Sequence, residues 1–258
     1  MLGRVIKSCY LIHVNMMLEM TFDTVIIIYV NVSRETLNMN TEKFEKYYQM
    51  LIETNEKFNL TAITDREEVF IKHFEDSLKL SDVVKDIGEK SYKIIDVGSG
   101  AGFPGIPLAI EYPNIQVCVS DTLRKRTNFL QEVVDELSLK NVKVVWSRAE
   151  DLAHDPSYRE SFDIATARAV ANLSTLTELC GAFVHKDGWF IPYKSSAVDD
   201  EISLAKNACG QIGLKLDRVY TYSLSQDMGA RSLLIYKKIS TTPDRFPRKA
   251  GTPSKKPL

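Results

Sequence analysis

The spacing of apolar residues divides this chain into a helical N-terminal part and a longer part in which strands and helices alternate. In residues 41–58, apolar side chains recur every three to four positions, which predicts an amphipathic helix. A second helix is expected after Asp65, because this residue is a suitable N-cap and Glu68 stands three positions later. Together the two helices predict an N-terminal helical cap over residues 39–90.

From Lys93 onward, short apolar runs alternate with helical patterns. Strands are predicted near 93–97, 115–120, 142–146, 162–167 and 188–193, and two closing strands, expected to be antiparallel, at 214–222 and 232–237. Helices are predicted around 107–111, 129–137, 173–183 and 197–209. This alternation is typical of βαβ units, so we predict an α/β domain over residues 91–240 with a mostly parallel seven-stranded sheet and helices on both faces.

The two ends of the chain lack these patterns. Residues 1–38 hold four methionines and no sustained periodicity, so we interpret them as an extension that is either disordered or not native, with translation beginning at Met39. Residues 241–258 hold four of the nine prolines and five basic residues. We expect this tail to be extended rather than helical.

Composition excludes several classes of protein. The formal net charge of −1 excludes a globally basic nucleic-acid binder, so any RNA contact has to come from a local patch. The four cysteines form no CxxC pair and no metal-like spacing with the four histidines, which predicts reduced thiols, a cytoplasmic protein and no metal site. No apolar run approaches the roughly 20 residues of a membrane span, so no membrane partner is expected.

A glycine-rich loop, DVGSGAGFPG at residues 96–105, follows directly on the apolar run at 94–97. Glycine lets a ligand approach the backbone where a Cβ would collide with it, so Gly98, Gly100 and Gly102 predict a site for a nucleoside-like cofactor. The third glycine comes one residue too early for the G-x-G-x-x-G of nicotinamide-dependent oxidoreductases. The spacing therefore favours an S-adenosylmethionine-dependent methyltransferase, although a tight turn without a ligand is the structural alternative.

Polar residues follow the next three predicted strands. Asp121 ends the second strand, where its carboxylate can accept hydrogen bonds from both ribose hydroxyls or, alternatively, cap a helix. Glu150 follows the third strand, where an acid or a backbone amide commonly borders adenine; the alternative is a solvated acid. Arg168 follows the fourth strand and is expected to orient a substrate, contact a phosphate or support the methionine carboxylate, unless it forms a structural ion pair.

Two local basic clusters are candidate RNA contacts. Arg124, Lys125 and Arg126 form the first, although the last two are also placed to serve the cofactor pocket. The second lies in the tail and contains Arg245, Arg248 and Lys249. Such clusters supply phosphate contacts whose affinity falls as salt rises. Phe246, within the second cluster, is expected either to stack on a base or to pin the tail to the domain.

Several motifs in order are similar to one family. DVGSGAGFPGIPLAI, SDTLRKRTNFL, SRAED, FDIATARAVANL and FPRKAGTPSKKPL, preceded by FNLTAIT and HFEDSL, resemble the bacterial small-subunit ribosomal RNA methyltransferases also called glucose-inhibited division protein B. The resemblance begins near residue 40 and continues to the C-terminus. One departure is Ser195 after Lys194, where a glycine is more usual, and it puts the conformation of that loop in question.

The resemblance implies a Rossmann-like class I methyltransferase fold, S-adenosylmethionine as cofactor and methylation of guanine N7 in 16S ribosomal RNA, either as RNA or within the small ribosomal subunit. It assigns cofactor contacts to Gly98, Phe103, Ala149, Glu150 and Arg168, to which the ribose argument adds Asp121. Guanine N7 carries no proton, so no catalytic acid or base is required. A cysteine nucleophile is not required either, so Cys180 is expected to be a buried helix residue. A non-catalytic RNA-binding or ribosome-assembly factor with the same fold is the first alternative, and a nicotinamide-dependent oxidoreductase with a variant glycine loop is the second.

Overall fold

The computed structural model describes residues 40–258, so the interpretation of residues 1–38 lies outside the described part. A helix over residues 40–55 confirms the first predicted amphipathic helix. Its apolar side chains Phe44, Tyr47 and Leu51 are buried. Residues 44–258 group as one unit.

The second predicted helix is present as consecutive helical pieces: α3 (Arg66–Val69), a π-helical stretch η1 (Phe70–Glu75), α4 (Asp76–Leu78) and α5 (Leu80–Val83). The Asp65 carboxylate accepts a hydrogen bond from the Glu68 backbone N–H at 3.0 Å, which confirms the N-cap. The Glu68 side chain pairs with Lys72, one turn later, at 2.5 Å. The wider π-helical turn precedes Asp76, whose side chain is buried.

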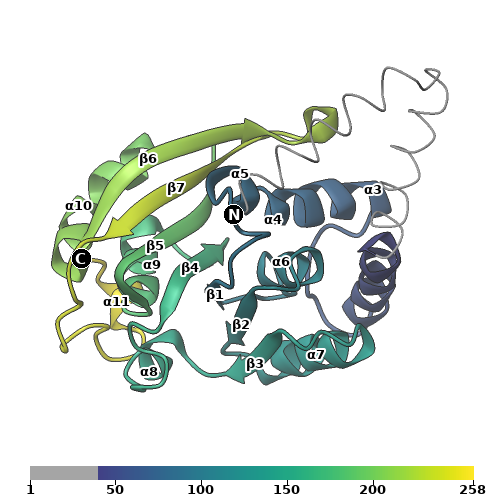
Figure 1. Cartoon of the computed structure of the whole chain (residues 1–258), viewed down its shortest axis with the longest axis horizontal. Coiled ribbons are helices and arrows are strands. Elements are labelled where there is room, and N and C mark those ends of the chain that lie inside the picture. The colour runs from purple at the N-terminus through teal and green to yellow at the C-terminus, as the bar shows by residue number, and fades with distance from the viewer. Residues whose placement is uncertain (1–39) are drawn as a thin grey trace, which may run out of the picture. The chain divides into compact units, whose positions relative to one another are not determined.

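The described residues form a seven-stranded sheet in the order β3-β2-β1-β4-β5-β7-β6 (Figure 1). Strands β1 to β5 are parallel, and β7 runs antiparallel to both β5 and β6. This arrangement confirms the predicted fold class. The strands are β1 (Lys93–Val97), β2 (Gln116–Asp121), β3 (Val142–Trp146), β4 (Phe162–Arg168), β5 (Val184–Ser195), β6 (Leu214–Ser223) and β7 (Ala230–Lys238).

Strand β5 begins four residues before the predicted position. Its first residues are HKDG after Val184, a polar run with no strand-like alternation, and Asp187 adopts a positive φ of 72°. The pairing with β4 also shifts register between Phe162 and Ile164. Sequence periodicity cannot reveal a strand through such an irregularity, because the alternation of side chains between the two faces is broken there.

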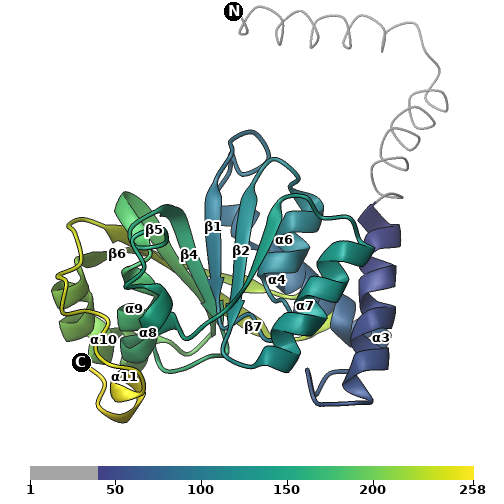
Figure 2. The same cartoon turned by 90° about the horizontal axis from the view of Figure 1, so that it is seen from below.

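Helices cover both faces of the sheet. Figure 2 shows α6 (Gly105–Glu111) and α7 (Arg124–Glu136) on one side and α9 (Leu173–Gly181) and α10 (Asp199–Ile212) on the other. Neighbouring strand residues point to opposite faces. Ile94 therefore belongs to the core under α6 and α7, whereas Ile95 belongs to the core under α9 and α10.

Two short helices were not predicted: α8 (Ala149–Leu152) and α11 (Thr252–Lys255). Helix α11 corrects the expectation of an extended tail. Pro253 is compatible with this helix because it stands in the first turn, where a missing backbone N–H is tolerated. Cys180 is buried on α9, as expected, and Cys118 and Cys209 are also buried free thiols. Within the part of the chain that the structure describes, no helix has the length and apolar character needed to cross a membrane.

Candidate functional site

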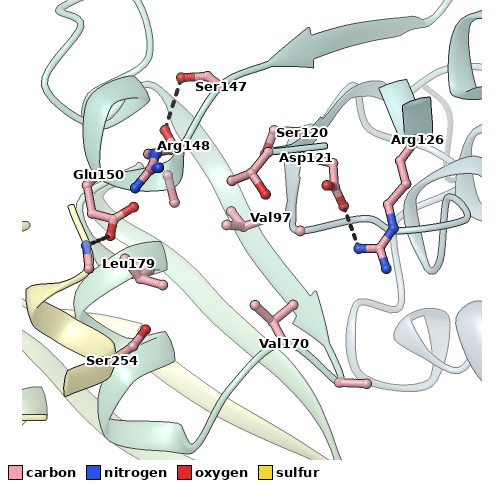
Figure 3. Close-up of a pocket in the computed structure, with 15 residues that line it drawn as sticks. Val97, Ser120, Asp121, Arg126, Ser147, Arg148, Glu150, Val170, Leu179 and Ser254 are labelled. Atoms are coloured by element: carbon pink, nitrogen blue, oxygen red, sulfur yellow. Dashed lines mark hydrogen bonds and ion pairs between the residues drawn. The ribbon is translucent and has the colours of Figure 1, made fainter. Parts of the chain in front are cut away.

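A pocket of about 480 Å³ lies at the carboxyl ends of the parallel strands β1 to β4 (Figure 3). Parallel α/β sheets bind ligands at this edge, because the strand ends and the loops that follow them meet there. The wall consists of Val97, Gly98, Ser120, Asp121, Thr122, Arg126, Ser147, Arg148, Ala149, Glu150, Ala169, Val170, Leu179, Gly251 and Ser254.

Four of the predicted cofactor residues line this pocket: Gly98, Asp121, Ala149 and Glu150. Arg126, a candidate for either an RNA contact or a cofactor contact, also lines it. The other predicted residues are not part of the wall; they are Gly100, Gly102, Phe103 and Arg168. The structure thus brings together residues that follow three different strands.

The three loop glycines all adopt positive φ angles, of 72°, 61° and 104° in order. The absence of a side chain allows different contacts at Gly98 and at Gly102. A Cβ on Gly98 would stand 2.8 Å from Val170 Cγ2 at the pocket wall. A Cβ on Gly102 would instead collide with the Tyr47 hydroxyl and with Ile106. Tyr47 donates to the Ala101 carbonyl, so Gly102 serves the packing of the N-terminal helix onto the loop.

The side chains of Asp96 and Asp121 accept hydrogen bonds from backbone N–H groups of the glycine loop. The Asp96 Oδ2 accepts from the Gly105 N–H at 2.9 Å, whereas its Oδ1 has no hydrogen-bond partner among the described residues. Complete burial raises the pKa of the Asp96 carboxyl to about 6. The Asp121 Oδ2 accepts from the Gly100 N–H at 3.0 Å and from Arg126 at 3.3 Å, and its Oδ1 accepts from the Leu123 N–H at 2.8 Å. Asp121 therefore fixes the loop and also faces the pocket.

Glu150 connects the pocket to the C-terminal tail. It stands in the first turn of α8, and its Oε1 accepts from the Gly251 N–H at 2.9 Å. Gly251 and Ser254 line the pocket although sequence reasoning did not predict them as site residues. About a hundred positions separate them from Glu150, so no local pattern could have indicated that they meet.

Arg168 lies outside the pocket wall, in a cluster with the N-terminal helices. Its Nη1 donates to Asp76 Oδ2 at 2.7 Å, and the Tyr222 hydroxyl donates to Asp76 Oδ1 at 2.6 Å. Its guanidinium lies 5.0 Å from the centre of the Phe103 ring, and the His73 ring stacks on the same phenyl at 4.4 Å. Burial and the charge of Arg168 lower the pKa of His73 to about 3. The ion pair that sequence reasoning left open is thus formed, and a contact of Arg168 with a ligand stays a prediction.

Each basic cluster has two cations that face solvent and one half-buried arginine that pairs with a carboxylate, Arg126 with Asp121 and Arg248 with Glu178. Arg124 and Lys125 are exposed, the first over the ring of Trp146 at 4.4 Å and the second over Phe58 at 4.8 Å. In the tail, Arg245 and Lys249 are exposed, whereas Arg248 pairs with Glu178 at 2.6 Å. Phe246 is buried and so pins the tail to the domain. No grouping of three or more potential metal ligands occurs within residues 40–258.

The chain is similar to proteins of one named family. The family model for rRNA small subunit methyltransferase G matches residues 40–228. A relative called ribosomal RNA small subunit methyltransferase G, from Lachnoclostridium phytofermentans, is 48% identical over 223 residues, which cover 84% of this chain and 89% of that one. A protein of the same name from Staphylococcus saprophyticus is 46% identical over 227 residues, covering 87% and 92% of the two chains.

Among solved structures, that of MtNAS in complex with MTA and tNA aligns with a TM-score of 0.50 and 18% identity, over 81% of this chain and 73% of that one. At this identity the alignment shows a shared fold. The family match includes the glycine loop, Asp121 and Glu150. The chain therefore belongs to the rRNA small subunit methyltransferase G family.

Proposed function

We propose that this protein transfers the methyl group of S-adenosylmethionine to N7 of a guanine in 16S ribosomal RNA. Its family makes it an S-adenosylmethionine-dependent rRNA methyltransferase. We infer that the acceptor is N7, that the methylated base is guanine and that the RNA is 16S ribosomal RNA. The observation that carries the proposal is the pocket at the sheet edge, which brings Gly98, Asp121 and Glu150 to one cavity.

The residues of the pocket fit the cofactor. Its volume of about 480 Å³ is within the usual range for small-molecule sites. The Asp121 carboxylate, which two backbone amides hold in place, keeps lone pairs that can accept from ribose hydroxyls. Gly98 lines the pocket beside Val170, and a Cβ on Gly98 would stand 2.8 Å from Val170 Cγ2. Ala149 and Glu150 would border the adenine.

The proposed methyl transfer requires this chain to align the reactants and does not require it to transfer a proton. The cofactor supplies an electrophilic methyl group on a sulfonium. Guanine N7 has an in-plane lone pair and no proton, so it attacks without a general base, and the protein has to hold nucleophile and methyl group in line. Arg168 and His73 pack on the buried Phe103 of the glycine loop from the side of the N-terminal helices and would contribute to this alignment.

Exposed cations next to the pocket would hold the RNA. Arg124 and Lys125 lie at the start of α7, three and four residues after Asp121, and Arg148 is an exposed residue of the pocket wall. Arg245 and Lys249 would add phosphate contacts from the tail, and we expect RNA affinity to fall as salt rises. A substrate in the small ribosomal subunit would place the enzyme in the cytoplasm.

One experiment tests the reaction. The protein is incubated with labelled S-adenosylmethionine and small ribosomal subunits that lack the modification, and the label is mapped by chemical cleavage at N7-methylguanine. We expect one labelled guanine in 16S ribosomal RNA. Label on another base or atom contradicts the proposal, and tight cofactor binding without any transfer favours a binding or assembly factor.

A further inference from the structure

The C-terminal segment, defined here as residues 246–254, forms part of the cofactor pocket. Gly251 and Ser254 line the cavity together with Glu150 and Leu179. Figure 3 shows Glu150, Leu179 and Ser254 on one flank of the pocket, with Asp121 and Arg126 on the opposite flank. The pocket therefore has a wall that does not belong to the strands or to the loops that follow them.

This segment is attached to the domain along its length. Phe246 is only 2% exposed, and Arg159 donates to the Phe246 carbonyl at 2.9 Å. A ring nitrogen of His154 lies 2.8 Å from the Pro247 carbonyl, and Thr175 Oγ1 donates to the Pro253 carbonyl at 3.1 Å. Thr175 lies on α9, and His154 and Arg159 lie in the loop after α8, so the segment bridges α9 and this loop.

The strongest attachment is between Arg248 and Glu178. The Arg248 side chain donates to both Glu178 oxygens, from Nε at 2.9 Å to Oε1 and from Nη2 at 2.6 Å to Oε2, and the Arg248 backbone N–H donates to Oε1 at 2.7 Å. Glu178 is fully buried on α9 and directly precedes Leu179 of the pocket wall. A buried carboxylate is stable only when it is paired, so Glu178 requires the C-terminal segment to be in this position.

The same segment reaches a proposed cofactor contact. The Gly251 N–H donates to Glu150 Oε1, and this bond holds the acid that would border the adenine. Gly251 has a φ of 81°, a conformation that a residue with a side chain rarely adopts. Three positions separate Gly251 from Arg248, so a shift at the ion pair moves the donor that orients Glu150.

We propose that the C-terminal segment is the wall of the pocket on the side of the cofactor's nucleobase, and that Arg248 and Glu178 are positioning residues for cofactor binding. By linkage, bound cofactor stabilises the segment in its docked position. The inference rests on S-adenosylmethionine being the ligand of the pocket and is independent of which base is methylated.

The first test measures the affinity for S-adenosylhomocysteine by calorimetry. Arg248→Ala is expected to raise the dissociation constant by about tenfold, equivalent to about 1.4 kcal/mol. Lys255→Ala, which removes an exposed cation of the same tail, is expected to leave it unchanged. Because Arg248→Ala strands a buried charge, the double variant Glu178→Met with Arg248→Ala replaces the acid by an apolar side chain. It is expected to restore the unfolding temperature and to keep the weakened binding.

The second test introduces a bulky side chain into the pocket from the C-terminal segment. Ser254 and Lys255 are neighbours on α11 and both are exposed, but only Ser254 lines the pocket. Ser254→Trp is expected to weaken S-adenosylhomocysteine binding by about tenfold or more, whereas Lys255→Trp is not. Equal affinities for the two variants would overturn the assignment of the wall.

The third test follows the segment directly. Trypsin cleavage after the exposed Lys249 is expected to slow several-fold when S-adenosylhomocysteine saturates the wild-type protein. The inference is wrong if ligand leaves this rate unchanged and Arg248→Ala binds normally, or if the wild type does not bind the ligand. A wild type that binds it but does not methylate guanine N7 refutes the proposed function and leaves the wall in place.

Discussion

At the scale of residues, Gly98 and Gly210 differ in backbone conformation and in what an added side chain would meet. Gly98 has a φ of 72° and a Cβ position 2.8 Å from Val170, whereas a Cβ on Gly210 of α10 would meet nothing within 4 Å. A side chain at a positive φ costs about 1–3 kcal/mol. In a helix interior, replacing glycine by alanine stabilises by roughly 0.5–1 kcal/mol.

We therefore expect Gly98→Ala to lower the free energy of unfolding by about 1–3 kcal/mol and to weaken S-adenosylhomocysteine binding. Gly210→Ala is the matched control, and we expect it to raise the free energy of unfolding without changing the binding. Urea unfolding and calorimetry measure the two quantities. Normal ligand affinity in a folded Gly98→Ala protein would remove Gly98 from the cofactor site.

Asp96 gives the protein a specific dependence on pH. Its pKa is about 6 in the folded protein and lower in the unfolded chain, where the carboxyl is hydrated. The folded state thus holds the proton more tightly, so the contribution of Asp96 to stability is full below about pH 4 and is lost as pH rises through 6.

Asp96→Asn keeps an acceptor for the Gly105 N–H and cannot ionise. We expect this variant to be more stable than the wild type above pH 7, by up to about 3 kcal/mol, with the difference shrinking toward pH 4. Urea unfolding of both proteins across this range measures it. A difference that stays constant with pH would show that Asp96 does not titrate as the structure indicates.

At the scale of elements, the helical pieces from α3 to α5 place the buried carboxylate of Asp76 against the sheet. Asp76 follows the π-helical stretch η1 and pairs with Arg168 of β4 and Tyr222 of β6. The pair joins the N-terminal helices to two strands that lie apart in the sheet. Arg168 and Tyr222 lie 92 and 146 positions after Asp76, so no local sequence pattern indicates either contact.

Asp76→Ala leaves Arg168 without its carboxylate in a largely buried position, so we expect a loss of about 3–5 kcal/mol in the free energy of unfolding. Asp217→Ala breaks a solvent-exposed pair with Arg218 and is expected to cost less than about 1 kcal/mol. Chemical denaturation of the two variants compares them directly. Similar losses would mean that the Asp76 pair is not a structural connection.

The sequence predicted elements well where one local signal dominates. Asp65 caps its helix, and the strands before the glycine loop and Asp121 end close to the predicted positions, because capping and alternation act over a few residues. It missed the start of β5, where the register shifts, and α11, where proline suggested an extended chain. In both cases contacts with distant residues outweigh the local preference.

At the scale of the whole molecule, the family match includes the N-terminal helix. The family model matches residues 40–228, a range that contains the helical residues 40–55. Tyr47 of that helix is fully buried and donates to the Ala101 carbonyl of the glycine loop. The helix is thus part of the core beside the site.

A chain that begins at Met39 is expected to keep the unfolding temperature, S-adenosylhomocysteine affinity and methyl transfer of the full chain. A chain that begins at Ile52 also lacks Phe44, Tyr47 and Leu51 and is expected to unfold at a lower temperature, because it loses buried apolar side chains. Loss of methyl transfer in a folded protein that begins at Met39 would show that residues 1–38 take part in the reaction.

The sequence by itself determined the α/β class, the glycine loop, Asp121 and Glu150, since each depends on short-range patterns and on which residue ends a strand. Only the tertiary structure decided that Arg168 pairs with Asp76, that Arg248 pairs with Glu178, and that Gly251 and Ser254 complete the pocket. These contacts join segments about 70 to 100 positions apart. They follow from how helices and the tail pack around the sheet, and packing between distant segments leaves no local pattern in the chain.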